Sequence, residues 1–222
     1  AGDMEMHTAG SLQDGKRVWG LAKVKDDFTI NGTDRVDSYL LLTNPHMYGR
    51  AVDIRFTPIR VVCNNTLTLS LAQKGDYQVS LNHKKAFDVQ EAKELLGVAK
   101  GKMETYKDMA TFLSSKRYTP ETLRTYYSTV FANQNPKVKG IGFNPADIVD
   151  FEKYGSKNAK LAMEVTNTQP GASLGEGSFW QAFNAVTYLT DHQLGREADS
   201  RLNSAWYGVN KVKKAKALET AL

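Results

Sequence analysis

The stretch Ala51–Ala72, AVDIRFTPIRVVCNNTLTLSLA, decides the fold of this chain, because its pattern changes halfway along from that of a strand. Residues 51–56 alternate apolar and polar side chains, as a half-buried strand does. Thr57 and Pro58 then fit an N-cap residue followed by proline at the first helical position. The sequence therefore predicts a helix over residues 58–71, while the β-branched side chains of that segment leave a strand as the alternative.

Four more segments have the composition of strands, with apolar runs or alternation between turn-forming residues. The clearest is DSYLLLT, whose unbroken apolar run indicates burial on both faces of a sheet. An Asn-Gly pair after the second segment is a strong turn signal. The predicted strands are residues 17–24, 28–30, 37–43 and 76–82.

Beyond residue 88 the periodicity becomes helical. Apolar side chains between Val89 and Leu113 recur at steps of three and four, which is typical of an amphipathic helix. Thr119 and Pro120 have the cap-and-proline pattern at the start of the next helix. The predicted helices are residues 89–113, 120–131, 145–153, 178–194 and 204–222, with loops at 133–142 and 166–177.

The order of strands first and helices second indicates an α+β fold, with an antiparallel sheet in the N-terminal half packed by helices and a helical C-terminal half. We expect a single domain over residues 1–222, because a chain of 222 residues is long enough for one well-buried core. In this domain residues 1–88 are expected to be mainly strands plus one helix, and residues 89–222 mainly helices.

The composition excludes several kinds of site. The only cysteine is Cys63, so the chain has neither a disulfide of its own nor a zinc site built from cysteines. The four histidines show no metal-binding spacing, and the segment GASLGEGS lacks the lysine of a phosphate loop. No apolar run approaches the ~20 residues of a membrane span. We therefore expect no metal, no cofactor and no membrane partner, and the sequence does not favour an enzyme.

Positive charge points to nucleic acid as a partner. The formal net charge is +5 and the isoelectric point is about 9.1. Basic side chains near the central strand, after the next strand and on the last helix are candidates to hold phosphates, and a nearby tyrosine is a candidate to stack on a base. The predicted contacts are Arg50, Arg55, Arg60, Lys84, Lys85, Lys213, Lys214 and Tyr48. The alternative is that these charges are only solvated.

A second set of polar residues forms a candidate ligand cleft: Asn64, Asn65, Asn184, Asp191 and His192. The two neighbouring asparagines interrupt an apolar run, so they are predicted either to fix this segment by buried hydrogen bonds or to contact a ligand. The other three lie on the helix predicted at 178–194, and the loop Gly171–Gly177 is expected to cap the cleft. Capping of the helix end is the alternative role of the histidine.

Six segments resemble, in this order, the phage/plasmid-like protein family, a domain of unknown function encoded by phages, plasmids and integrated elements: RVWGLAKV, YLLLTNPH, VDIRFTPIRVVCNNTLTLSLA, SLNHKK, FWQAFNAVTYLTDH and SAWYGVNKVKKAKAL. The most specific parts are RFTPIRVVCNNTL and NAVTYLTDH. The resemblance implies a cytoplasmic protein of a phage-infected or plasmid-bearing bacterial cell, without established catalytic residues. Members usually run longer at the N-terminus, so it also implies that the opening of this chain lacks part of the fold.

Three functional hypotheses follow. The first is a nucleic-acid-binding protein that binds and anneals single-stranded DNA in recombination, since the expected strands followed by a helix are similar at fold level to the cores of single-strand annealing proteins. Annealing proteins usually work as rings or filaments, which leaves a homo-oligomer open. The second hypothesis is a small-ligand protein or enzyme that uses the cleft. The third is a protein-interaction module, such as a host-defence inhibitor or virion component, that uses the helix at 89–113.

Overall fold

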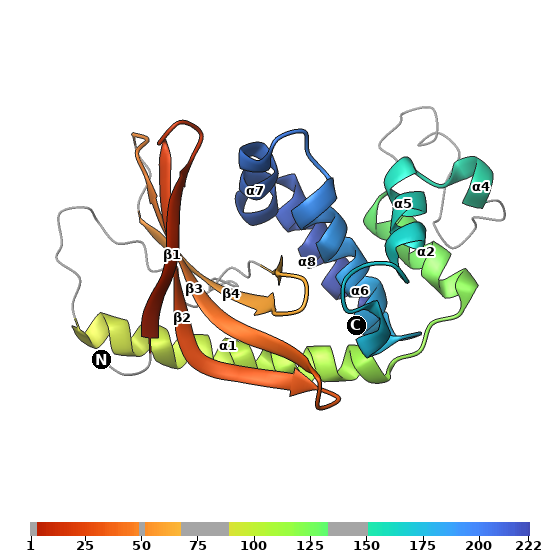
Figure 1. The fold of residues 1–222 in the computed structure, drawn as a ribbon, viewed down its shortest axis with the longest axis horizontal. Helices are drawn as coiled ribbons and strands as arrows, with labels where there is room; N and C mark the ends of the chain where they lie inside the picture. Colours follow the sequence, from red (N-terminus) through yellow and green to blue (C-terminus); the bar gives the residue numbers. More distant parts are fainter. Residues whose placement is uncertain (1–3, 49–51, 68–88, 133–150) are drawn as a thin grey trace.

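The computed structural model describes residues 4–48, 52–67, 89–132 and 151–222. Its strands form one antiparallel five-stranded sheet, in which each strand pairs with the next one along the chain. The sheet is strongly curled (Figure 1). The strands are β1 (Met4–Leu12), β2 (Arg17–Ile30), β3 (Asp34–Pro45), β4 (Asp53–Arg60) and β5 (Asn65–Thr66). The antiparallel sheet predicted for the N-terminal half is therefore confirmed.

The helices follow the sheet in sequence. The long helix α1 runs along the sheet in Figure 1, and most of the later helices lie to the right of the sheet, above α1. The helices are α1 (Val89–Ser115), α2 (Pro120–Val130), α4 (Phe151–Tyr154), α5 (Lys157–Val165), the 3₁₀-helix η2 (Ala172–Gly175), α6 (Phe179–Tyr188), the π-helix η3 (Leu189–Gln193), α7 (Ala198–Tyr207) and α8 (Val209–Ala221). The predicted α+β class is confirmed.

The two faces of the sheet pack against different helices. On one face Leu40 and Phe56 belong to a large core that also contains Met103 of α1 and Trp180 of α6. On the opposite face Leu41 belongs to a smaller cluster that includes residues of α7. Adjacent residues of a strand point to opposite faces, so the apolar run of β3 is buried on both sides as predicted. The first face is closed by the core, whereas part of the second face is left for a groove.

Strand β4 corrects the prediction of a helix over residues 58–71. Thr57 and Pro58 lie inside β4, where Pro58 pairs with Ser38 of β3. The carbonyl of Pro58 accepts a hydrogen bond from the backbone N–H of Leu67, so the ring nitrogen also faces away from β3. Proline is tolerated because β3 requires no N–H donor at this position. Strand pairing therefore outweighs the cap-and-proline pattern. The predicted helix continues as a turn at residues 61–64 and as β5, and only residues 68–71 of it lie outside the described residues.

Two other predicted boundaries are wrong. The strands predicted at 17–24 and 28–30 are one strand, β2, with a register irregularity between Val24 and Asp27. The single helix predicted at 204–222 is two helices, because the backbone is extended at Gly208, with φ −114° and ψ −148°. The first of the two, α7, also begins earlier than predicted, at Ala198.

The remaining predictions divide into those confirmed and those that fall outside the described residues. The capping box of α2 is present, since the side chain of Thr119 accepts from the backbone N–H of Thr122 and the side chain of Thr122 accepts in return. The predicted strand at 76–82 and loop at 133–142 are not among the described residues, and the predicted helix at 145–153 is described only from Phe151. The prediction lacks β1 and α5.

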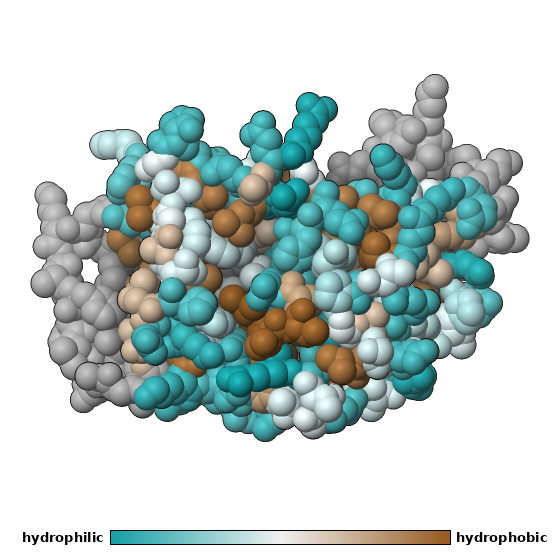
Figure 2. Space-filling model, in the orientation of Figure 1, coloured by the Kyte–Doolittle hydropathy of each residue, from teal (hydrophilic) through white to brown (hydrophobic). Residues whose placement is uncertain are grey.

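The predicted loop at 166–177 is fixed to the sheet instead of standing free. Arg60 donates to the carbonyl of Gly171 at 2.8 Å, and a Cβ added to that glycine would lie 2.5 Å from Val62. Val61 and Val62, in the turn between β4 and β5, are themselves partly exposed. Figure 2 shows hydrophobic atoms gathered at the centre of the face that is turned to the viewer, where the turn between β4 and β5 lies in Figure 1. Among the described residues, no helix is long and apolar enough to cross a membrane.

Candidate functional site

The candidate site is a groove of about 480 Å³ between the second face of the sheet and the segment η3–α7, called here the sheet groove. Three sets of residues line it. The sheet contributes His7, Thr8, Trp19, Leu21, Tyr39 and Ile59. The helical segment contributes Asp191, His192, Ala198, Arg201, Leu202 and Trp206. The segment after β4 contributes Asn64 and Thr66.

Strand alternation explains why these sheet residues share one face. In β2 the residues Trp19, Leu21 and Lys23 are two apart and therefore point to the same side. The register places Leu21 opposite Leu41 and Lys23 opposite Tyr39. The sequence thus builds one wall of the groove from every second residue of adjacent strands, while the residues between them enter the core.

Aromatic rings form much of the floor. Trp19 meets Trp206 of α7 edge to face, with ring centroids 4.9 Å apart and planes at 88°. His7 and Tyr39 form a second pair at 5.3 Å and 61°. Gly10 of β1 leaves room for the indole, because a Cβ there would lie 2.8 Å from the ring of Trp19. Edge-to-face pairs stabilise such an arrangement beyond the burial of the rings alone, so these contacts favour one orientation of the rings in the floor.

A buried ion pair lies behind the groove wall. Lys214 of α8 is fully buried, and its Nζ lies 2.6 Å from Oδ1 of Asp191. It also donates to the carbonyl of Thr66 at 2.7 Å. The other carboxylate oxygen, Oδ2, accepts from the backbone N–H of Thr66 at 2.6 Å. Both oxygens of Asp191 are therefore engaged, which makes this carboxylate a fixed acceptor and not a free base.

The environment of Lys214 shifts its proton equilibrium. Burial lowers the pKa of Lys214, and the neighbouring Asp191 carboxylate partly opposes this effect. The same lysine and the indole N–H of Trp206 both donate to Oγ1 of Thr66, at 3.1 and 3.2 Å. A two-residue strand, the π-helix and two C-terminal helices are thereby joined by one polar cluster behind the groove.

Basic side chains lie around the groove. His7, His192 and Arg201 line the groove, and Lys23 follows on the same face of β2. The ammonium of Lys23 lies 6.0 Å from the ring centroid of Tyr39. Its hydrogen bond to Asp37 at 2.6 Å raises the pKa of Lys23. The rim therefore carries basic groups beside aromatic ones, with one of the cations already paired to an acid.

Three of the five predicted cleft residues meet at the sheet groove: Asn64, Asp191 and His192. The other two, Asn65 and Asn184, are buried behind it. The side-chain amide of Asn65 donates to the carbonyl of Asn184 at 3.1 Å and to Oγ1 of Thr187 at 2.9 Å. These two asparagines therefore fix β5 to α6, while the binding role of the first three stays a prediction. The loop Gly171–Gly177, expected as a cap, does not line this groove.

Two of the predicted phosphate contacts are buried. Arg60 is 3% exposed, and its Nη2 lies 2.7 Å from Oδ2 of Asp34, which is fully buried. Lys214 is likewise enclosed by Asp191 and Thr66. A phosphate cannot reach either cation in this structure, so its geometry argues against these two contacts. Arg60 and Lys214 can be buried because each pairs with an aspartate that lies far from it in the sequence, Asp34 and Asp191 respectively. Composition does not reveal such pairs.

The other predicted contacts lie apart from one another. Arg55 is partly buried, hydrogen-bonded to Asp53, and has its guanidinium 5.2 Å from the ring centroid of Tyr207. Lys213 lies on the far side of α8, 5.8 Å from the ring centroid of Phe131. Tyr48 is fully exposed. Arg50, Lys84 and Lys85 lie outside the described residues. The predicted contacts that are described thus form no single surface.

Sequence reasoning missed the contribution of α7. Leu202 and Trp206 are four residues apart and so share one face of the helix, which places both on the groove. That spacing was available in the sequence, but the predicted single helix at 204–222 begins after Leu202. The partnership of Trp19 with Trp206, by contrast, depends on tertiary packing that spacing does not specify.

The groove offers no metal site, since no group of three or more metal-binding side chains occurs among the residues that the structure describes. No curated protein and no solved structure matches the chain. A family model does match it, over residues 1–206, and the description of that family is a domain of unknown function, DUF932. Because the match spans most of the 222 residues, the chain belongs to this family.

Proposed function

We propose that this protein binds single-stranded nucleic acid in the sheet groove, with one base seated between the sheet and α7. The observation that carries the proposal is the combination in one groove of an aromatic and aliphatic floor with basic side chains at the rim. Proteins that bind single strands combine ring surfaces for bases with cations for the backbone. The groove has both components within about 480 Å³.

A nucleobase suits this groove because it is planar, with apolar faces and polar edges. Leu21, Ile59 and Leu202 supply apolar wall on both sides. Asn64 and Thr8 supply hydrogen-bonding groups. A base inside a duplex hides its faces in the stack, so such a groove favours unpaired strands.

Basic side chains at the rim can contact the backbone of the nucleic acid. Arg201 lies on α7 and donates one hydrogen bond to the carbonyl of Gly195 at 3.3 Å, which leaves its other guanidinium donors for a phosphate. His7 and His192 stand on the sheet side and on η3. These residues replace the buried Arg60 and Lys214 as the proposed phosphate contacts.

Strand annealing, recombination and a phage or plasmid setting belong to this proposal as its finer part. They are supported by the sequence resemblance and by the order of the elements, a curled antiparallel sheet followed by one long helix. That support is an analogy of fold, which by itself does not identify function. The protein-interaction alternative gains little from α1, because Ala99, Met103, Tyr106, Ala110 and Leu113 are buried in the core and Phe112 is the one large apolar side chain exposed on its described part.

The test is fluorescence anisotropy with a labelled single-stranded oligonucleotide and the matching duplex, across a salt series. Thr8→Phe fills the groove from β1, and Ser11→Phe is the matched control, because Ser11 is exposed on the other face of the same strand. A stacked base contributes roughly 1–3 kcal/mol. Thr8→Phe should therefore weaken single-strand binding about tenfold or more, and Ser11→Phe should leave it unchanged.

Arg201→Gln tests the proposed phosphate contact in the same assay. Its matched control is Arg124→Gln, because Arg124 is exposed on α2 and does not line the groove. Loss of one phosphate contact should reduce the slope of log affinity against log salt by about 0.7 for a single strand. Equal binding by both phenylalanine variants, or no binding by the unmodified protein at low salt, would refute the proposal.

A small planar ligand is the second candidate for the same groove, favoured by the hydrogen-bonding side chains of Thr8 and Asn64 among its apolar lining. Mononucleotides added as competitors separate the two functions. Saturable binding of a mononucleotide that is independent of salt and of strand length would favour the small ligand.

A further inference from the structure

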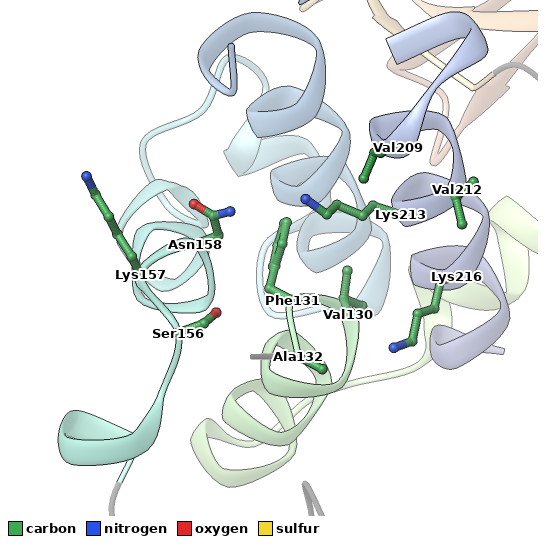
Figure 3. A pocket seen from close by; sticks show the side chains of 10 residues that line it. All are labelled: Val130, Phe131, Ala132, Ser156, Lys157, Asn158, Val209, Val212, Lys213 and Lys216. Carbon is green, nitrogen blue, oxygen red and sulfur yellow. The ribbon is translucent and has the colours of Figure 1, made fainter. Parts of the chain in front are cut away.

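A second pocket, of about 500 Å³, lies at the opposite side of α8 from the sheet and is called here the lysine pocket. It is bounded by the C-terminal end of α2, the start of α5 and one face of α8. Figure 3 shows Phe131 between the helices and Lys213 reaching across the opening toward α5. The pocket shares no lining residue with the sheet groove, so it is a separate feature of the molecule.

One wall of the lysine pocket is apolar and exposed. Val209 and Val212 are one turn apart on α8, and they are 65% and 67% exposed. Phe131 is buried at the floor. Most exposed apolar side chains of soluble proteins stand singly, whereas these two valines meet a buried ring in one concave site. The pocket therefore offers apolar surface to a ligand that can reach into it.

The charged residues that line this pocket are all lysines: Lys157, Lys213 and Lys216. None of the three forms an ion pair with a residue that the structure describes. Lys216 donates to the carbonyl of Thr129 at the end of α2, which gives that lysine a structural role as well. Among the residues that the structure describes, no carboxylate lines the pocket, so the charge that they place there is of one sign.

The position of Lys213 strengthens the case for an anion. Its ammonium lies 5.8 Å from the ring centroid of Phe131, and burial lowers its pKa. A carboxylate placed beside it would restore the interactions that the ammonium loses with water, because a partly desolvated cation gains most from a charged partner.

We propose that the lysine pocket binds an acidic peptide segment of a partner protein, with an apolar side chain against Val209 and Val212 and carboxylates facing the three lysines. Charge complementarity selects an acidic ligand, and the apolar wall selects one with a hydrophobic side chain. A nucleic-acid backbone would satisfy the lysines, but an unpaired base would find no exposed ring to stack on in this pocket, because Phe131 is buried. The peptide is therefore the occupant that uses both parts of the site.

The test uses the full chain and a fluorescein-labelled peptide rich in aspartate, with phenylalanines at its centre. Two control peptides replace either the phenylalanines by serine or the aspartates by lysine. We expect saturable binding of the first peptide, weakened by salt, and loss of at least about tenfold in affinity, or about 1.4 kcal/mol, with each control peptide.

Two exposed positions test the site itself. Lys157→Glu reverses one charge and Val212→Gln removes one apolar contact, and each should weaken the peptide about tenfold. The matched controls are Lys107→Glu, on an exposed face of α1, and Val61→Gln, in the turn after β4. Thermal unfolding of each variant confirms that it folds. The two control variants should bind as the unmodified protein does.

Two results would overturn the proposal. One is a folded Lys157→Glu or Val212→Gln variant that binds the acidic peptide as well as the unmodified protein does. The other is an oligonucleotide whose binding is lost in Lys157→Glu while the peptide does not bind at all, which would make the lysines a phosphate-binding surface. Failure of the sheet groove to bind nucleic acid would leave this result unaffected, because the two sites share no residue.

Discussion

Asp34→Asn is the most informative perturbation of the fold, because it removes one charge from a buried cluster with almost no change of shape. The carboxylate of Asp34 accepts from Nε and Nη2 of Arg60, at 2.8 and 2.7 Å. It also accepts from the indole N–H of Trp180 at 2.7 Å. Asparagine keeps one acceptor oxygen, which can occupy the Oδ2 position shared by Arg60 and Trp180, but it then directs an NH₂ group at Nε of Arg60 and carries no charge to balance the guanidinium.

The loss is large because Arg60 stays charged. Burial opposes its charge, but the hydrogen bonds and charge of Asp34 outweigh burial and raise the pKa of Arg60. Removing one partner of a buried ion pair costs about 3–5 kcal/mol. In a domain of this size, each kcal/mol lowers the melting temperature by about 2–4 °C. We therefore expect Asp34→Asn to melt roughly 6–20 °C below the unmodified protein.

Asp27→Asn is the matched control. Asp27 pairs with Arg35 at 3.0 Å, but the two side chains are 49% and 48% exposed. Exposed pairs contribute about 0–1 kcal/mol, so this variant should unfold close to the unmodified protein. Urea unfolding followed by far-ultraviolet circular dichroism measures both free energies.

A second variant tests the cause of the loss. Adding Arg60→Met to Asp34→Asn removes the unpaired cation, and stability should be partly recovered. The reasoning is refuted if Asp34→Asn loses no more free energy of unfolding than Asp27→Asn, or if Arg60→Met worsens the double variant.

Three further predictions concern other parts of the fold. Burial raises the pKa of three tyrosines: Tyr106, Tyr126 and Tyr127. Above about pH 10 the unfolded chain loses these protons first, so the free energy of unfolding should fall as pH rises, by about 1.4 kcal/mol per pH unit for each tyrosine. Urea unfolding at stepped alkaline pH measures this slope of free energy against pH, and Tyr106→Phe should reduce it. An unchanged slope in that variant contradicts the assignment. Thr119→Ala removes the N-cap of α2 and should cost about 1 kcal/mol in the same assay, whereas no loss would mean that the capping box does not contribute. Gly10→Ala presses on the indole behind β1 and should cost about 1–3 kcal/mol; unchanged stability and tryptophan fluorescence would show that the ring has room to move.

The fold class followed from local patterns because the sheet and the helices occupy separate halves of the chain. DSYLLLT indicated a strand buried on both faces, and β3 is such a strand. Thr57 and Pro58 misled the prediction, since a cap followed by proline looks the same in sequence as a strand whose proline faces away from its neighbour. What separates the two is the pairing with β3, a non-local interaction that a pattern within one segment cannot register.

Only part of the candidate site could be predicted from the sequence, for the same reason. Asn64 was a candidate because it interrupts an apolar run, and Asp191 and His192 because they lie on the helix predicted at 178–194; all three line the sheet groove. Lys214 gave no such signal, because in VKKAKAL it resembles its solvated neighbours. Its burial depends on Asp191, 23 residues earlier in the chain. Charge alone therefore predicted a basic surface where the structure has an interior ion pair.

The two-residue strand β5 has a consequence for how the protein is made. The carbonyl of Thr66 accepts a hydrogen bond from Lys214, which lies 148 residues later in the chain. The carboxylate of Asp34 accepts one from Trp180, which lies 146 residues later. At about 5–20 residues per second, a ribosome needs roughly 7–30 s to synthesise such an interval. Throughout that time the emerging sheet has polar groups without their final partners and an uncovered second face. Until α7 and α8 have been synthesised, the nascent chain therefore exposes this apolar face, which later packs against Ala205 and Trp206.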